Sequence, residues 1–293
     1  MIYCLENDFV RVQIKGVGAE LCSYYDKQTE REVMWQANPV HWKRHAPILF
    51  PIVGKVKNNS YKLENNTYNL NQHGFARDQN FNLIQQSVSS ITLGIKANEE
   101  TKKIFPFDFY LRVKYILSQK ELKVIYEVEN FSQQNIYFCI GAHPGFNCPF
   151  DNKTTFSDYQ LNFEKKESSD RILLNSNGFR TGKRSNKWLS NQSIQLTENL
   201  FLEDALVFDD LESKYLLIES PKINEKVKVG WHNYPHMGIW KPLNNAPFIC
   251  IEPWNGMADE DNLNNDFKDK YGVLNLNPDK NFECFYTIEN IIE

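Results

Sequence analysis

The stretch FYLRVKYILSQKELKVIYEV, from Phe109 to Val128, decides the fold class. In both halves of this stretch apolar and polar side chains alternate, which places them on opposite faces of an extended chain. The runs at 111–116 and 122–128 therefore predict two β-strands, each with one face towards a core and one towards water.

Similar runs recur about every ten residues and are separated by turn-like clusters of Asn, Ser, Gln and Pro. This spacing is typical of a β-sandwich or barrel rather than of alternating strands and helices. The sequence shows no long helical stripe, repeat or linker, so it predicts one large, mostly antiparallel all-β domain over residues 1–293. Further strands are expected at 81–84, 91–97, 136–140, 205–208, 215–219, 227–231, 237–240, 248–251 and 282–288.

Several shorter features complete this prediction. Residues 9–14 and 19–25 alternate around Gly16 and Gly18, which indicates an antiparallel hairpin. Two prolines within 47–53 favour an edge or irregular strand, because proline cannot donate a ladder hydrogen bond. Residues 61–70 predict a small hairpin. The polar segment 150–200 is expected to form loops, with a strand near 159–163.

Composition limits the function classes. The net charge is −4 and the charges are scattered, so no basic stripe is available for nucleic acid. The N-terminus is acidic and no run approaches the ~18 apolar residues of a membrane span, so we expect no membrane partner and a cytoplasmic location. Six cysteines without metal-ligand spacing are expected to be buried thiols. Aromatic residues make up 14%, which suits a sugar-like or flat ligand.

Three short motifs combine polar groups with glycine or proline at the ends of expected strands. They are QHGFARD at 72–78, GAHPGFN at 141–147 and FICIEPWNG at 248–256. Glu252 follows an apolar strand and precedes a proline, so its carboxylate is expected to emerge at a strand end, where partial burial would raise its pKa and suit it to act as a general base. The alternative is an ordinary strand-end glutamate paired with a lysine.

Two histidines and an aspartate are further candidates. His143 also precedes a proline at a strand end and could donate a proton near neutrality, although an isolated histidine in an apolar setting is often a satisfied core residue. His73 is followed by Gly74, which permits close backbone approach, and by Arg77, which is rarely found in a core. These neighbours favour a place in a binding or active site. Asp204 precedes an apolar strand. An acidic side chain in a solvated turn explains this position as well as a role in a site does. These residues lack local metal-ligand spacing, so we expect no metal site and no cofactor.

The motifs taken together resemble the aldose 1-epimerase (mutarotase) superfamily, and especially its LacX-like branch. The order and spacing of the motifs carry the resemblance over nearly the whole chain. They are GAEL at 18–21, LFPIVG at 49–54, QHGFARD, GAHPGFN, EDALVF at 203–208 and FICIEPWNGMAD at 248–259. The resemblance implies a large galactose mutarotase-like β-sandwich of the supersandwich type that interconverts sugar anomers without a cofactor.

The resemblance also implies roles for individual residues. Glu252 is similar to the base that takes the proton from the anomeric hydroxyl, and His143 to the acid that protonates the ring oxygen. His73 and Asp204 would bind and orient the sugar hydroxyls. An acid and a base of complementary protonation are what ring opening and closure require.

Other roles are left open by the sequence. Trp240 and Phe146 are expected to form an apolar wall against the sugar. Arg77, Lys55 or Arg44 could supply the cation that contacts it, because the chain departs from the arginine-rich run of mutarotases after residue 54. A hexose 6-phosphate substrate, a non-catalytic carbohydrate-binding or sugar-sensing protein, and a homodimer all stay open at this point.

Overall fold

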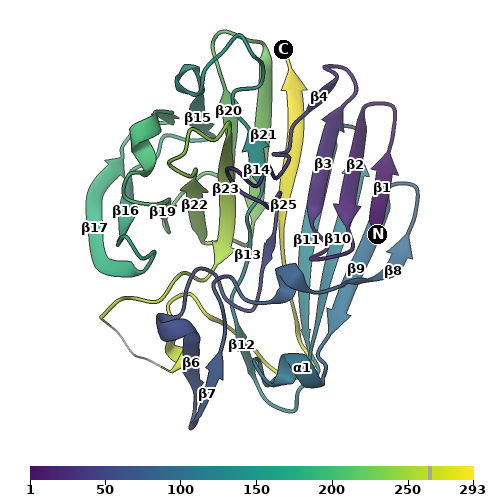
Figure 1. Ribbon diagram of the computed structural model, residues 1–293, viewed down its shortest axis with the longest axis vertical. Coiled ribbons are helices and arrows are strands. Elements are labelled where there is room, and N and C mark those ends of the chain that lie inside the picture. The colour runs from purple at the N-terminus through teal and green to yellow at the C-terminus, as the bar shows by residue number, and fades with distance from the viewer. Residues whose placement is uncertain (263–265) are drawn as a thin grey trace.

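The structure is a computed structural model that describes residues 1–262 and 266–293. It is built almost entirely from antiparallel strands (Figure 1). The longest layer is a nine-stranded sheet. Its strands, in spatial order, are β18 (Ser193–Gln195), β15 (Gln160–Phe163), β20 (Tyr215–Glu219), β21 (Glu225–His232), β25 (Asn281–Ile292), β11 (Glu121–Asn130), β10 (Phe109–Ser118), β9 (Ser90–Lys96) and β8 (Asn82–Gln86).

Two further sheets cover one face of this layer. A four-stranded sheet lies over the half formed by β8 to β11, and an eight-stranded sheet lies over the other half (Figure 1). The four-stranded sheet consists of β1 (Ile2–Glu6), β2 (Val10–Lys15), β3 (Leu21–Asp26) and β4 (Arg31–Glu32). The other has the order β17 (Arg180–Leu189), β16 (Ser169–Leu174), β19 (Leu206–Phe208), β22 (His236–Trp240), β23 (Phe248–Asn255), β13 (Ile140–Ala142) and β5 (Ile48–Leu49), with β14 (Gly145–Asn147) also paired to β23.

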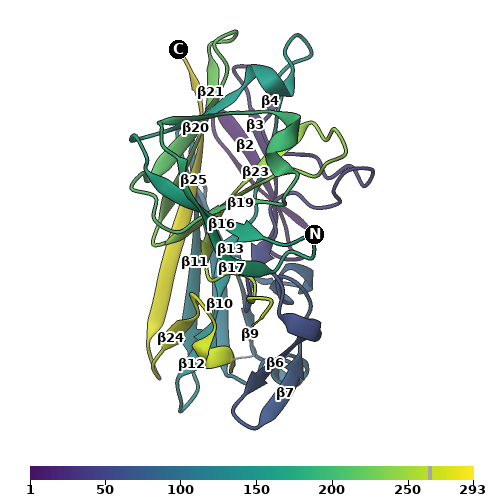
Figure 2. The same ribbon diagram turned by 90° about the vertical axis from the view of Figure 1, so that its left-hand side faces the viewer.

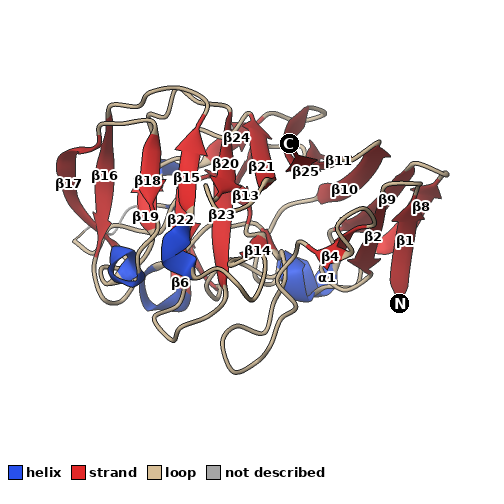
Figure 3. Ribbon diagram, turned by 90° about the horizontal axis from the view of Figure 1, so that it is seen from above, coloured by secondary structure: helices blue, strands red, loops and turns tan. Residues whose placement is uncertain are grey.

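The remaining elements are short. One hairpin, β6 (Ser60–Leu63) and β7 (Asn66–Asn69), projects at the lower end of the molecule in Figures 1 and 2. The pair β12 (Ile136–Phe138) and β24 (Leu274–Leu276) forms a separate two-stranded sheet. The helical segments lie in the connections between strands (Figure 3). They are α1 (Glu99–Lys102) and the 3-10 turns η1 (Lys57–Asn59), η2 (Ala76–Asp78), η3 (Phe156–Asp158), η4 (Glu198–Phe201) and η5 (Phe267–Asp269).

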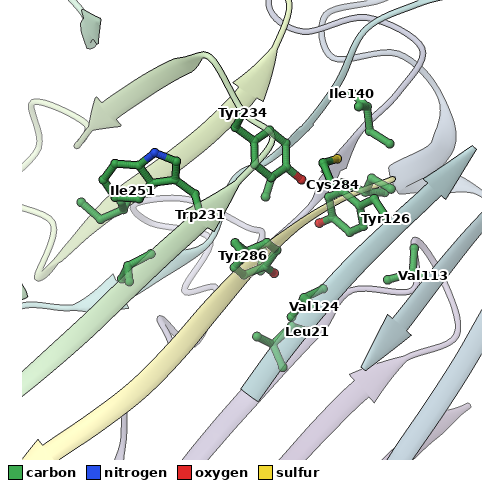
Figure 4. Close-up of a cluster of buried hydrophobic side chains, with 14 of the residues drawn as sticks. Leu21, Val113, Val124, Tyr126, Ile140, Trp231, Tyr234, Ile251, Cys284 and Tyr286 are labelled. Carbon is green, nitrogen blue, oxygen red and sulfur yellow. The ribbon is translucent and has the colours of Figure 1, made fainter. Parts of the chain in front are cut away.

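The alternation around Phe109–Val128 is confirmed. Strands β10 and β11 pair in register with Val113 opposite Tyr126 and Tyr115 opposite Val124, and these four side chains are buried. Their apolar face meets side chains from the covering sheets, which Figure 4 shows as one continuous cluster. This burial of large apolar side chains between sheets is the main force that holds a sandwich together.

The prediction for segment 150–200 is wrong in part. The strand near 159–163 is confirmed as β15, but residues 169–189, which were expected to form loops, make the β16–β17 hairpin at the edge of the eight-stranded sheet. Strand β17 reads RTGKRSNKWL and buries only its last residue, so it carries no apolar alternation to reveal it. Edge strands can be this polar because one side of the ladder faces solvent.

The predictions for the hairpins, the edge strand and the cysteines can also be compared with the structure. The hairpins at 9–25 and 61–70 and the edge strand within 47–53 are confirmed as β2–β3, β6–β7 and β5. Five cysteines are buried, but Cys4 is exposed on the outer strand β1. Within the described residues, no helix is long and apolar enough to cross a membrane.

Candidate active site

A cavity of about 420 Å³ opens between the eight-stranded sheet and the QHGFARD turn. Its size falls in the range of small-molecule sites. Six of the nine residues singled out in the sequence line it together, although they come from distant parts of the chain. These are His73, Arg77, His143, Asp204, Trp240 and Glu252.

Glu252 lies in the middle of β23 and not at its end, because the strand continues through Pro253 to Asn255. Proline is tolerated here in an eight-residue strand whose every residue is buried. The Glu252 side chain is 2% exposed, and it faces the cavity. The alternative of a strand-end glutamate paired with a lysine is wrong, since the carboxylate contacts a histidine.

The register of β23 brings His143 to this carboxylate. Strands β13 and β14 both pair with β23, with Gly141 opposite Trp254 and Gly145 opposite Cys250. His143 lies in the connection between these two strands, so it is held above the segment of β23 that contains Glu252. The Nε2 atom of His143 lies 3.1 Å from Oε2 of Glu252.

Burial sets the protonation of this pair. It raises the pKa of Glu252 well above its usual range, and the negative charge of Asp204 raises it further. Burial also lowers the pKa of His143 to about 3. His143 was expected to be an acid by itself near neutrality, but the structure makes it neutral there. At neutral pH these directions leave the Glu252 carboxyl protonated and the His143 ring neutral, and two groups in contact titrate as a pair.

A strained turn positions His73. Its φ is 66° and that of Gly74 is 71°, both in the left-handed region. A Cβ on Gly74 would lie 2.2 Å from the carbonyl oxygen of Phe50, so only glycine fits. The backbone N–H of Gly54 donates to Nδ1 of His73 at 3.2 Å. Because burial lowers the pKa of His73 well below its usual range, the ring is neutral and its proton lies on Nε2, which faces the side-chain amide of Gln72 at 3.1 Å.

Asp204 also has a left-handed backbone, with φ at 65°. It lies between η4 and β19, where its N–H donates to the carbonyl of Phe201 at 3.1 Å. One carboxylate oxygen accepts a hydrogen bond from the N–H of Ala205 at 2.8 Å, which leaves the other free to face the cavity that Asp204 lines. Non-glycine residues in such conformations often occur at functional sites, where surrounding structure holds them.

Of the three cations left open by the sequence, Arg77 reaches the cavity. It lies on η2, and its Nη2 donates to the carbonyl of Gln72 at 2.6 Å. Its buried Nε has no hydrogen-bond partner among the described residues, and burial lowers its pKa to about 10. Arg44 does not line the cavity and pairs with Asp78 at 2.8 Å. Lys55 does not line it either, since its Nζ donates to a backbone carbonyl at 2.7 Å.

Aromatic side chains form two walls. Trp240 lines the cavity as expected, and Trp42 stacks on His143 with ring centroids 4.8 Å apart. Trp254 also lines it, and its buried Nε1 has no partner among the described residues. The expectation for Phe146 is wrong. Its ring is fully buried in the main core because β14 turns it away from the cavity.

Sequence reasoning missed Arg180, which lines the cavity from the first position of β17. Its Nε donates to the carbonyl of Ala258 at 3.0 Å, and its Nη1 lies 3.4 Å from Glu260. The polar pattern of this segment gave no indication of a strand. Trp42 and Trp254 were visible as tryptophans near histidine and glutamate motifs. Nothing in the sequence placed Trp42 against His143 or Trp254 in the cavity lining.

One set of potential metal ligands is brought together within the described residues. It consists of His143, Cys250 and Glu252, whose ligand atoms lie within 4.8 Å of one another. This set differs from the two histidines, glutamate and aspartate weighed in the sequence.

Comparisons with known proteins show the family of this chain. The family model described as aldose 1-epimerase matches residues 1–266. Protein LacX of Lactococcus lactis subsp. lactis is 33% identical over 282 residues, which is 94% of each chain. A galactose mutarotase related enzyme from Lactobacillus acidophilus superposes with a TM-score of 0.95 at 37% identity, covering 99% of this chain and 97% of that one.

A second solved structure extends the similarity. A galactose mutarotase-like protein from Lactobacillus casei superposes with a TM-score of 0.94 at 31% identity, covering 99% of this chain and 100% of the other. The fold is therefore the galactose mutarotase-like β-sandwich, and a mutarotase-like epimerase activity is supported. From its sequence and its fold, the chain belongs to the aldose 1-epimerase family.

Proposed function

We propose that the protein interconverts the α and β anomers of a hexose by opening and closing the sugar ring. The observation that carries this proposal is the contact of 3.1 Å between His143 and Glu252 inside a cavity of sugar size. The two groups hold one proton between them, which is the number that ring opening must pass from one sugar oxygen to the other.

The reaction uses the pair as base and acid. In the free protein the proton lies on Glu252, and as the sugar binds it passes across the 3.1 Å contact to Nε2 of His143, which leaves Glu252 ionised. Glu252 takes the proton of the C1 hydroxyl while His143 gives its proton to the ring oxygen, and the bond between C1 and that oxygen breaks. The resulting aldehyde rotates, and the reverse transfers close the ring on its other face. Each group contributes ~10² to 10⁴ in rate.

Other cavity residues hold the sugar. The Nε2–H of His73 donates to one hydroxyl, and the free carboxylate oxygen of Asp204 accepts from another. Trp240 packs against an apolar face of the sugar ring. None of these contacts requires a metal or an organic cofactor.

A direct test is polarimetry or saturation-transfer NMR on freshly dissolved α-glucose and α-galactose. Purified protein should accelerate the approach to anomeric equilibrium above the buffer rate. Sugar binding by calorimetry without any acceleration would instead identify a sugar-sensing protein and would refute the catalytic proposal.

A second candidate substrate is a hexose 6-phosphate. Arg77 favours it, because its guanidinium group lies at the cavity and such a group suits a phosphate oxygen. Its Nε makes no hydrogen bond among the described residues and lies 3.8 Å from Oδ2 of Asp78. If this candidate is correct, Arg77→Gln lowers kcat/KM for glucose 6-phosphate by tenfold or more relative to glucose. An equal loss on both sugars would assign Arg77 to a hydroxyl or to the turn.

The location also remains a proposal. Six free cysteines, five of them buried, suit a reducing compartment such as the cytoplasm. Detection of a tagged chain in cell fractions would test it.

A further inference from the structure

A thiol lies directly beside the acid/base pair. Cys250 and Glu252 are two positions apart on β23, so their side chains share a face of the sheet. The Sγ atom of Cys250, a ring nitrogen of His143 and a carboxylate oxygen of Glu252 lie within 4.8 Å of one another. All three residues are buried, and the acid/base chemistry makes no use of the thiol.

We propose that Cys250, His143 and Glu252 form a binding site for a thiophilic divalent cation, Zn²⁺ in particular, and that the bound ion switches the acid/base pair off. The proposal of a metal-binding site depends only on the positions of these three side chains. The proposal that the ion inhibits turnover also depends on the proposed function.

The ligand set matches the chemistry of this ion. Thiolate, imidazole nitrogen and carboxylate are the three protein ligands that Zn²⁺ uses. Bond lengths of ~2.0–2.3 Å around a tetrahedral ion place ligand atoms ~3.5 Å apart. His143 and Glu252 already lie 3.1 Å apart, so only the thiol has to move closer. The strand and its buried neighbours hold all three ligands in advance of the ion.

The charge balance also favours a divalent cation. A Zn²⁺ ion with one thiolate, one carboxylate and a neutral imidazole has no net charge. Binding therefore buries no uncompensated charge, which removes the cost that burial imposes on each ionised group alone.

The ion would enter by the route of the sugar. His143 and Glu252 line the cavity, whereas Cys250 lies behind them, so the fourth coordination position faces the cavity. A bound ion occupies Nε2 of His143 and the carboxylate of Glu252. Neither group can then exchange protons with a sugar, and sugar and metal compete for the same space.

The binding arm of the test uses Co²⁺ as a spectroscopic substitute for Zn²⁺. Chelator-treated protein should take up about one equivalent and develop a near-ultraviolet band from thiolate-to-cobalt charge transfer. Zn²⁺ should displace the Co²⁺. Cys250→Ser, nearly isosteric with the native residue, should lose the band and weaken Zn²⁺ binding by about tenfold or more. Cys22→Ala, which removes a buried thiol on β3 instead, should keep both.

The activity arm measures mutarotation with and without Zn²⁺. The ion should inhibit the native protein reversibly, chelator should restore the rate, and excess sugar should protect. Relative to its own metal-free rate, Cys250→Ser should resist inhibition, while Cys22→Ala should respond as the native protein does.

The two arms separate the two proposals. A cobalt band that depends on Cys250, together with no mutarotation of any sugar, supports the metal site and overturns the proposed function. A missing band, a band that persists in Cys250→Ser, or equal inhibition of Cys250→Ser and the native protein overturns the metal site.

Discussion

The Nε2 atom of His143 lies 3.1 Å from Oε2 of Glu252, with both side chains buried at the wall of one cavity. Burial opposes the charged form of each group, so neither ionises independently of the other. The pair therefore holds a single proton at neutral pH, and the raised pKa of Glu252 and the lowered pKa of His143 place it on the carboxyl group.

Replacement of Glu252 by glutamine should abolish turnover and spare binding. The amide keeps the shape of the carboxyl group but cannot take a proton, so kcat/KM should fall by ~10² to 10⁴. Polarimetry measures the rate and calorimetry measures sugar affinity. Glu212→Gln, an exposed change remote from the cavity, should behave as the native protein. Full activity in Glu252→Gln would show that another group is the base.

Replacement of Asp204 by asparagine should move the alkaline limb of the pH profile. The negative charge of Asp204 raises the pKa of Glu252, so its removal makes the carboxylate easier to form. The pair then loses its proton at lower pH, and kcat/KM should decline at lower pH than in the native protein. The exposed Asp8→Asn change should leave the profile in place. An unmoved limb would mean that Asp204 acts on the sugar alone.

Gly74→Ala should disrupt the turn that carries His73. The new Cβ would meet the carbonyl of Phe50, and alanine disfavours a φ of 71°. We expect a loss of about 1–3 kcal/mol in the free energy of unfolding and weaker sugar binding. Urea denaturation and calorimetry measure the two effects. Gly16→Ala is the matched control, because its Cβ would have no neighbour nearer than 3.6 Å. Similar effects from both changes would contradict this role of Gly74.

His236 should make stability depend on pH. Burial lowers its pKa from 6.5 to about 4, and its Nδ1 accepts a hydrogen bond from the N–H of Gly256. The unfolded chain binds a proton below pH 6.5 while the folded chain does so only near pH 4. Stability is therefore complete above pH 6.5 and falls as pH drops through this window, by up to about 3 kcal/mol.

His236→Asn keeps an acceptor near Nδ1 but cannot titrate, so its unfolding free energy should fall less steeply between pH 6.5 and 4. Thermal or urea unfolding across this range gives the comparison. The exposed His232→Asn change should keep the native slope. If His236→Asn also kept it, the pH dependence would have to come from other groups.

Much of the fold could be predicted because the alternation of apolar and polar residues in a strand follows the alternation of buried and exposed side chains. Strands such as β10 and β11 bury every second residue, so their pattern in the sequence is the pattern in the structure. The outer strand β17 exposes most of its side chains, and no apolar period marks it. Arg180 was missed for this reason, since its place in the site depends on a strand with no local signal.

The site residues could be predicted where they lie in short, recognisable sequence motifs. His73, His143 and Glu252 each lie in a motif with glycine or proline, and the structure brings them together. Side-chain direction was not predictable in the same way. Phe146 follows His143 by three residues, yet strand β14 turns its ring into the core, and only the pairing of β14 with β23 determines that.

Strand β25 lies at the centre of the nine-stranded sheet, between β21 and β11. Its two neighbours come from different parts of the chain and have no ladder with each other in this order. During synthesis, therefore, the two halves of the sheet keep open edges until β25 emerges from the ribosome. A nascent chain that stalls before residue 281 exposes two unpaired edges that could pair with other chains, so chaperone protection is needed until β25 has been made.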